Sequence, residues 1–105
     1  VGAAAGRWHS LLLRDCGAAV AFGGNDYGQC DVPPLPDGAR YAAVAAGGAH
    51  SVLLRDDGAA VAFGSDDFGQ CRVPEALAGE RCVAAAAGTH HTLLLTEGGR
   101  AVAFG

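Results

Sequence analysis

The chain has 105 residues and a formal net charge of -4; 50% of its residues are hydrophobic and 17% are charged. This composition is too apolar for a disordered segment, and no apolar run approaches the roughly 18 residues of a membrane helix. All seven basic residues are arginines, which excludes a Schiff-base lysine and a P-loop lysine. The arginines are scattered in an acidic chain, which argues against a nucleic-acid surface.

One sequence unit recurs along the chain without gaps, as the equal spacing of His9-Ser10, His50-Ser51 and His91-Thr92 shows. The chain therefore divides into a partial repeat at 1–23 and repeats at 24–64 and 65–105, which form one repeat region over 1–105. A period of about 40 residues indicates a solenoid or a propeller. The positions that keep their residue type, and that we expect to build the common frame, are Gly6, His9, Gly17, Phe22, Gly23, Gly28, Gln29, Gly47, His50, Gly58, Phe63, Gly64, Gly69, Gln70, Gly88, His91, Gly99, Phe104 and Gly105.

Within one unit, residues 42–82, the order of elements is that of a propeller blade. An Ala-rich strand ends in paired glycines, "HSVLLRD" is a second strand, and Asp57-Gly58 predicts a two-residue hairpin to a third strand, "AAVAF". The polar "SDDFGQC" is a loop, and "RVP" is a short edge strand, which makes four antiparallel strands per blade. A helix is the alternative for "CVAAAAG", although glycine bounds this run in every copy.

The strands "SLLLR", "SVLLR" and "TLLLT" do not alternate between apolar and polar residues, so both faces of each sheet must be covered. Stacked blades meet this condition, with the Ala-rich strands nearest a central channel. We therefore expect an all-β chain of about two and a half blades. Because it contains no methionine, we also expect it to be a fragment of a longer protein.

The motifs Gly-x-x-His-Ser/Thr, Val-x-Phe-Gly and Asp-Tyr/Phe-Gly-Gln resemble the regulator-of-chromosome-condensation repeat, in its short-period tandem variety. The resemblance covers essentially the whole chain and implies a seven-bladed propeller. Phe-Gly stands here where members of the family usually carry Trp-Gly. This aromatic exchange should keep the packing role.

The histidines and cysteines do not form a metal-binding pattern. His9, His50 and His91 repeat with the blade spacing of roughly 10 Å, whereas zinc ligands lie about 2 Å from one point. We therefore expect structural histidines, hydrogen-bonded where a strand begins. No C-x-x-C is present, and Cys30 and Cys71 on neighbouring blades should lie too far apart for a disulfide. Neither a metal nor another cofactor is expected, and reduced thiols point to the cytoplasm or the nucleus.

The carboxylates also recur at fixed positions of the repeat. Asp15, Asp56 and Glu97 adjoin the hairpin, whereas Asp26 and Asp67 lie in the polar loop. Residues reused in every unit are more often turn formers than catalysts, so we predict that the chain is not an enzyme. Gly28 and Gly69 match no phosphate-binding pattern and are interpreted as turn residues.

Partner recognition should depend on the positions that vary within the constant frame. Positions 7, 48 and 89 carry Arg, Gly and Thr, and positions 8, 49 and 90 carry Trp, Ala and His, in a turn on one rim. We predict a partner site at Arg7, Trp8, Ala49 and His90; the alternative for Trp8 is packing under a loop. Asp31 and Arg72 also vary and are interpreted as solvated charges.

These observations favour a non-catalytic scaffold that binds protein partners. The alternative is a regulatory module, either of a guanine-nucleotide exchange factor for a small GTPase or of a ubiquitin ligase that uses the propeller to bind substrates. The end blades should expose apolar faces that only further blades or self-association would cover. The sequence predicts no membrane contact, and it does not specify the partner, the number of blades or any fused domain.

Overall fold

The computed structural model describes residues 2–35, 38–74 and 80–105. These residues form nine strands and no helix: β1 (Gly2–Ala5), β2 (His9–Leu13), β3 (Ala19–Gly23), β4 (Tyr41–Ala46), β5 (His50–Arg55), β6 (Ala60–Gly64), β7 (Cys82–Ala87), β8 (Thr92–Thr96) and β9 (Ala101–Phe104). The run "CVAAAAG" is strand β7, so the helical alternative is wrong. Short runs bounded by glycine cannot nucleate a stable helix, and pairing with a neighbouring strand satisfies their backbone groups instead.

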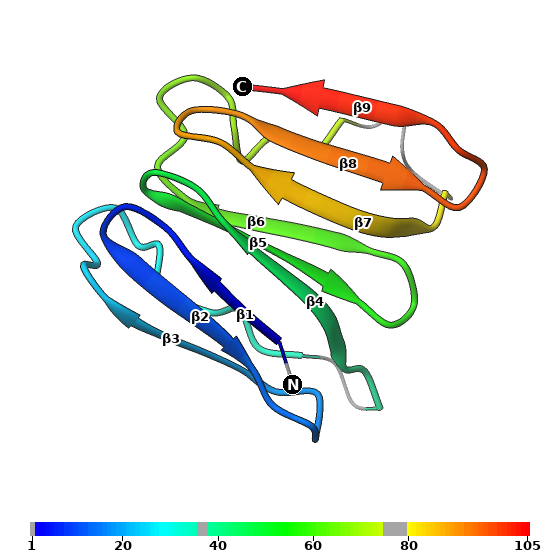
Figure 1. The fold of residues 1–105 in the computed structure, drawn as a ribbon, viewed down its shortest axis with the longest axis horizontal. Helices are drawn as coiled ribbons and strands as arrows, with labels where there is room; N and C mark the ends of the chain where they lie inside the picture. Colours follow the sequence, from blue (N-terminus) through cyan, green and yellow to red (C-terminus); the bar gives the residue numbers. More distant parts are fainter. Residues whose placement is uncertain (1, 36–37, 75–79) are drawn as a thin grey trace.

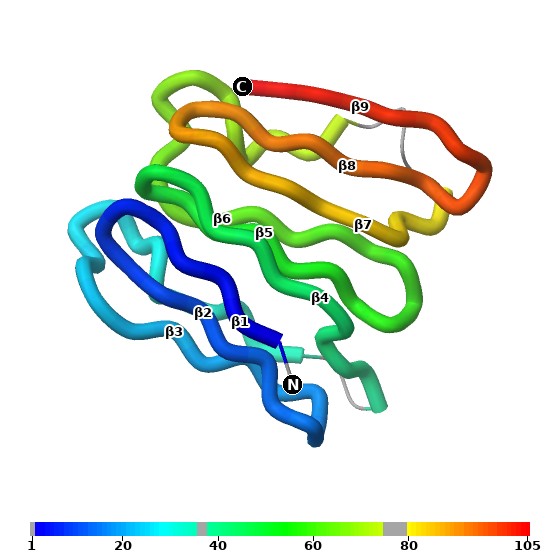
Figure 2. The backbone as a smooth tube through the Cα atoms, viewed as in Figure 1, coloured from blue at the N-terminus to red at the C-terminus, as the bar shows by residue number. Residues whose placement is uncertain are grey.

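The strands form three antiparallel sheets in chain order, β1-β2-β3, β4-β5-β6 and β7-β8-β9. Figure 1 shows the sheets lying side by side in chain order, and Figure 2 shows the same arrangement as a backbone tube. The Ala-rich strands β1, β4 and β7 contact one another from sheet to sheet. Small side chains allow this close approach, and the predicted all-β stack of repeats is confirmed.

Each sheet has three strands in the described residues, whereas we expected four strands per blade from the sequence. The three sheets correspond to the expected region of about two and a half blades. Residues 31–35 and 72–74 are not in strands. Val32 instead donates its N–H to the Cys30 carbonyl at 3.0 Å, and Pro33 has no N–H to offer a neighbouring strand. Val32 and Val73 still pack against the cores. The edge segment therefore covers the sheet with side chains but adds no strand.

The hairpin between β5 and β6 has a three-residue loop rather than the predicted two-residue loop. Arg55 donates its N–H to the Ala59 carbonyl at 2.8 Å, which encloses residues 56–58. Gly58 has a φ of +91°, and no described non-glycine residue has a positive φ. These features indicate a type I turn followed by a left-handed glycine, because a two-residue type I′ turn would require Asp57 to adopt a positive φ.

Two apolar clusters lie between the sheets. Leu53 contributes to the cluster shared with the first sheet, whereas Val52 and Leu54 contribute to the cluster shared with the third. Strand β5 is buried on both faces, as the lack of alternation predicted. In contrast, Leu12 and Leu93, in the central strands of the outer sheets, are each 42% exposed. The two ends of the stack therefore present apolar side chains to solvent.

Candidate interaction surface

One edge of the stack gathers the segments that vary between repeats. The turns at 6–8, 47–49 and 88–90, and the loops at 24–31 and 65–72, lie together on the left side of Figure 1. The three tight hairpins occupy the opposite edge. We refer to the edge formed by these turns and loops as the variable rim.

Buried histidines join neighbouring sheets beneath the variable rim. His9 Nε2 lies 2.8 Å from Ser51 Oγ, and that hydroxyl donates to the Gln29 carbonyl at 2.7 Å. The hydroxyl hydrogen is therefore committed, so the imidazole must donate. These two hydrogen bonds link the start of a strand in one sheet to the next sheet and to the loop between the sheets. We call this arrangement the histidine latch.

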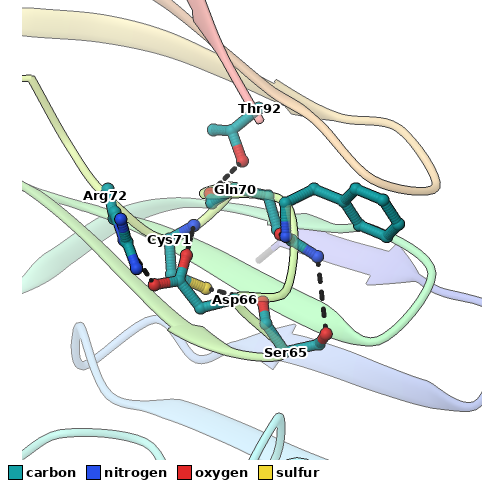
Figure 3. Close-up of polar contacts among 7 residues, drawn as sticks. Ser65, Asp66, Gln70, Cys71, Arg72 and Thr92 are labelled. Atoms are coloured by element: carbon teal, nitrogen blue, oxygen red, sulfur yellow. Dashed lines mark hydrogen bonds and ion pairs between the residues drawn. The ribbon is translucent and has the colours of Figure 1, made fainter.

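The second interface repeats the same latch. His50 Nε2 lies 3.0 Å from Thr92 Oγ1, which donates to the Gln70 carbonyl at 2.7 Å. Figure 3 shows this Thr92–Gln70 contact. Burial lowers the pKa of His50 below its ordinary value of 6.5. Its Nδ1 is buried and makes no hydrogen bond in the described structure, so burial opposes protonation of the ring.

The latch also explains the glycine of the Gly-x-x-His motif. A Cβ added to Gly47 would overlap His50 Cε1 and the Gly88 carbonyl oxygen. The imidazole ring occupies the space that any side chain at this position would need. His91 is the third histidine of the set and directly precedes β8. It is exposed because the described residues form no further sheet beyond β7-β8-β9.

The loop at 65–72 is held by its own side chains (Figure 3). Cys71 donates its backbone N–H to Asp66 Oδ1 at 2.9 Å and its thiol to the Ser65 carbonyl at 3.2 Å. Asp66 Oδ2 also accepts from Arg72 Nε at 3.0 Å. Arg72, interpreted from the sequence as a solvated charge, has a side chain that is 78% exposed and that also pairs with Asp66 in its own loop.

The loop at 24–31 repeats this arrangement with different side chains. Asn25 Oδ1 accepts from the Cys30 N–H at 2.8 Å, and Asn25 Nδ2 donates to Asp31 Oδ1 at 3.0 Å. Gly28 has a φ of +78°, as expected for a turn residue. Asx side chains and one left-handed glycine thus fix both loops.

All four cysteines are free in the structure. Burial, with Asp66 nearby, raises the pKa of the Cys71 thiol to about 11. Burial also raises the pKa of Cys30 and of Cys82. These three thiols therefore resist ionisation and act as weak donors or apolar groups.

The four residues predicted to contact a partner lie together. Arg7, Trp8, Ala49 and His90 line one groove of about 150 Å³ on the variable rim. The Arg7 guanidinium lies over the Trp8 ring, 4.9 Å from its centroid. Trp8 is 57% exposed, so it does not pack under a loop as the alternative interpretation required.

The groove also contains residues that the sequence analysis did not single out as partner contacts, namely Tyr27, Asp67 and Phe68. Tyr27 and Phe68 are 55% and 59% exposed, and Phe68 stacks on His90 with ring centroids 4.5 Å apart. Both aromatic residues occupy the same place in the repeat. This shared position was visible in the sequence, but it looked like part of the constant frame.

The candidate metal ligands and carboxylates are spread over the described residues. No group of three or more His, Cys, Asp or Glu side chains lies close enough to hold a metal ion in this part of the chain. The hairpin carboxylate Asp56 accepts the Arg40 N–H at 3.3 Å, whereas Asp26 and Asp67 are exposed on the rim. None of the described segments is a helix long and apolar enough to cross a membrane.

Comparison with known families gives an identification at residues 41–70, which match the regulator of chromosome condensation (RCC1) repeat. The chain carries an RCC1 repeat. The matched residues include the latch residue His50, the β5–β6 hairpin and Gln70. No curated protein sequence matches the chain.

Solved structures show that the chain has the fold of RCC1-type β-propellers. Prp20p from Saccharomyces cerevisiae is 24% identical with a TM-score of 0.83, and the match covers 97% of this chain and 32% of that one. Human WBSCR16 is 26% identical with a TM-score of 0.81, over 96% of this chain and 33% of that one. The ectodomain of the Physcomitrella patens receptor kinase CR4 is 21% identical with a TM-score of 0.79, over 100% and 29%. The chain thus spans about a third of the length of the first two.

Proposed function

We propose that the chain is a non-catalytic protein-interaction module and that its partner binds the groove on the variable rim. The observation that carries this proposal is the exposed aromatic row of Trp8, Tyr27 and Phe68, each more than half exposed in one groove. Large aromatic side chains that remain exposed on a rigid frame are typical anchors of protein interfaces.

The frame beneath the groove supports this assignment. The latches and the loop hydrogen bonds hold the backbone of the rim, so little conformational entropy remains to be lost when a partner binds. The Arg7 guanidinium is stacked on Trp8, where its donors can reach carbonyl or carboxylate oxygens of a partner. The cytoplasm or the nucleus is the compartment that we propose.

A second candidate function comes from one of the structural relatives. The crystal structure of Prp20p is described together with its binding to Gsp1p and histones, and the sequence analysis kept exchange on a small GTPase as an alternative. At 24% identity this likeness carries the fold alone, so the interaction module is the function that we propose. A substrate-binding role in a ubiquitin ligase would be a special case of the same module.

The test is quantitative affinity purification with the full-length protein from its own cells. The double variant Trp8→Ala/Tyr27→Ala should lose a defined set of partners, whereas Asp15→Asn on the opposite edge should retain them. Retention of every partner by the double variant would refute the groove as the contact surface. Accelerated GDP release from a small GTPase would instead support the exchange-factor alternative.

A further inference from the structure

The groove contains a gap in an otherwise aromatic row. Gly24 donates its N–H to the Trp8 carbonyl at 2.6 Å, and Ser65 donates its N–H to the Ala49 carbonyl at 2.9 Å. Each loop therefore begins beside the turn of its own sheet. It ends against the next sheet, where the Gln29 carbonyl accepts from Ser51 and the Gln70 carbonyl accepts from Thr92. Along the rim the side chains come in the order Trp8, Tyr27, Ala49, Phe68 and His90.

Ala49 stands where the other two repeats carry a ring. Phe68 stacks on His90 of the next turn, with 4.5 Å between the ring centroids. Tyr27 occupies the same place in the preceding repeat, but the equivalent position of its next turn is Ala49, which has no ring. The space that a ring would fill is thus open between Tyr27 and Phe68. The whole groove, of which this space is a part, has a volume of about 150 Å³, the size of a cavity that holds one benzene ring, so the groove has room for a single side chain.

The charge of the surrounding loops is negative. The loops at 24–31 and 65–72 carry Asp26, Asp31, Asp66 and Asp67 against one arginine, which pairs with Asp66. Asp67 lines the groove, is exposed, and makes no ion pair within the described residues. Aromatic faces beside a free carboxylate form the environment that attracts a cation.

We propose that the gap at Ala49 accepts an arginine side chain of a protein partner. The inference rests on the proposed function and names the chemistry recognised at the same site. The planar guanidinium would stack against Tyr27 and Phe68 and donate to the Asp67 carboxylate. Arginine is favoured over lysine because its flat, weakly hydrated head matches aromatic walls and a carboxylate together. Arg7 is engaged at the far end of the groove, on Trp8.

The chain supplies the variant that fills the gap. Ala49→His places at position 49 the ring that the equivalent position 90 carries naturally, so we expect the turn to accommodate it. Ala101→His is the matched control, because it introduces the same side chain at an exposed position at the opposite end of its sheet. Asp67→Asn removes only the charge.

The experiment selects random heptapeptides displayed on phage against the full-length protein and its variants. We expect peptides enriched in one arginine position on the wild-type protein and on Ala101→His, and no such enrichment on Ala49→His. A synthetic copy of the enriched heptapeptide with citrulline for arginine, which keeps the shape and loses the charge, should bind at least tenfold more weakly. Asp67→Asn should weaken binding of the arginine peptide several-fold and leave the citrulline peptide unchanged.

Three outcomes would overturn the inference. Enrichment of aromatic residues would assign the gap to a partner ring, equal binding of the citrulline peptide would remove the role of charge, and identical enrichment on Ala49→His would place the contact elsewhere. If the last result occurs while Trp8→Ala/Tyr27→Ala abolishes enrichment, the proposed function stands and only the arginine inference fails. If neither variant changes the enrichment, both proposals fail.

Discussion

Replacing Thr92 by valine should destabilise the protein far more than the loss of one oxygen atom suggests. The Thr92 side chain is fully buried, accepts from His50 Nε2 and donates to the Gln70 carbonyl. Valine keeps the volume but leaves a buried imidazole and a buried carbonyl without partners, at about 1–3 kcal/mol for each group. We therefore expect a loss of about 3 kcal/mol in the free energy of unfolding.

Thr92→Ser is the matched control, because Ser51 performs the same task in the preceding repeat. It loses one buried methyl group, about 1 kcal/mol. Urea unfolding of the full-length protein, followed by circular dichroism, measures both variants, and equal m-values are required for the comparison. The expected difference in the free energy of unfolding between the two variants is about 2 kcal/mol. If the two values differ by less than about 0.5 kcal/mol, the latch does not stabilise the interface.

The buried histidines, the tight glycines and the free thiols each support a further prediction. Because burial lowers the folded-state pKa of His50, the unfolded chain binds the proton first; stability should be constant above about pH 7 and fall as the pH drops through about 6.5. Melting temperatures between about pH 5 and 8 measure this fall, which His50→Gln should reduce; an unchanged slope would contradict it. Gly47→Ala should lower the free energy of unfolding by about 3 kcal/mol, because its methyl group would overlap the His50 ring. The control Gly98→Ala should cost little, because its methyl group would meet only a side-chain oxygen at 4.0 Å. Equal effects of the two variants in denaturation would refute this packing. Iodoacetamide at about pH 8 should alkylate the exposed Cys16 well before Cys71, whose thiol pKa is about 11, as peptide mapping by mass spectrometry would show; faster labelling of Cys71 would be contrary to the structure.

The exposed end faces bear on the expectation that further blades or self-association must cover them. Leu93 and Leu95 are 42% and 40% exposed on one outer sheet, and Val20 is 40% exposed on the other. Solvent-exposed apolar sheet faces of this kind favour association. We expect the isolated 105-residue chain to aggregate or form oligomers, which light scattering after size exclusion would detect; a stable monomer would refute this.

Much of the local structure could be predicted because each signal is local. Short apolar runs such as "HSVLLRD" that do not alternate favour a strand covered on both faces, and β5 is buried on both faces accordingly. The hairpin was placed correctly but with the wrong loop length, since Asp57-Gly58 fits two turn types and only the backbone angle of Asp57 distinguishes them. The prediction of an edge strand at "RVP" was wrong, because a segment of β-forming residues before proline can pack its side chains on the core without pairing its backbone with a neighbouring strand.

The sequence by itself determined the repeat, the strands within it and the positions free to vary, because a constant period holds every unit to one backbone. The tertiary structure decided which residues of different repeats meet. The latch joins His50 to Thr92, 42 residues away, and the groove brings Trp8 and Phe68 to one surface. These contacts depend on the offset between stacked sheets, a long-range packing property that no local pattern encodes.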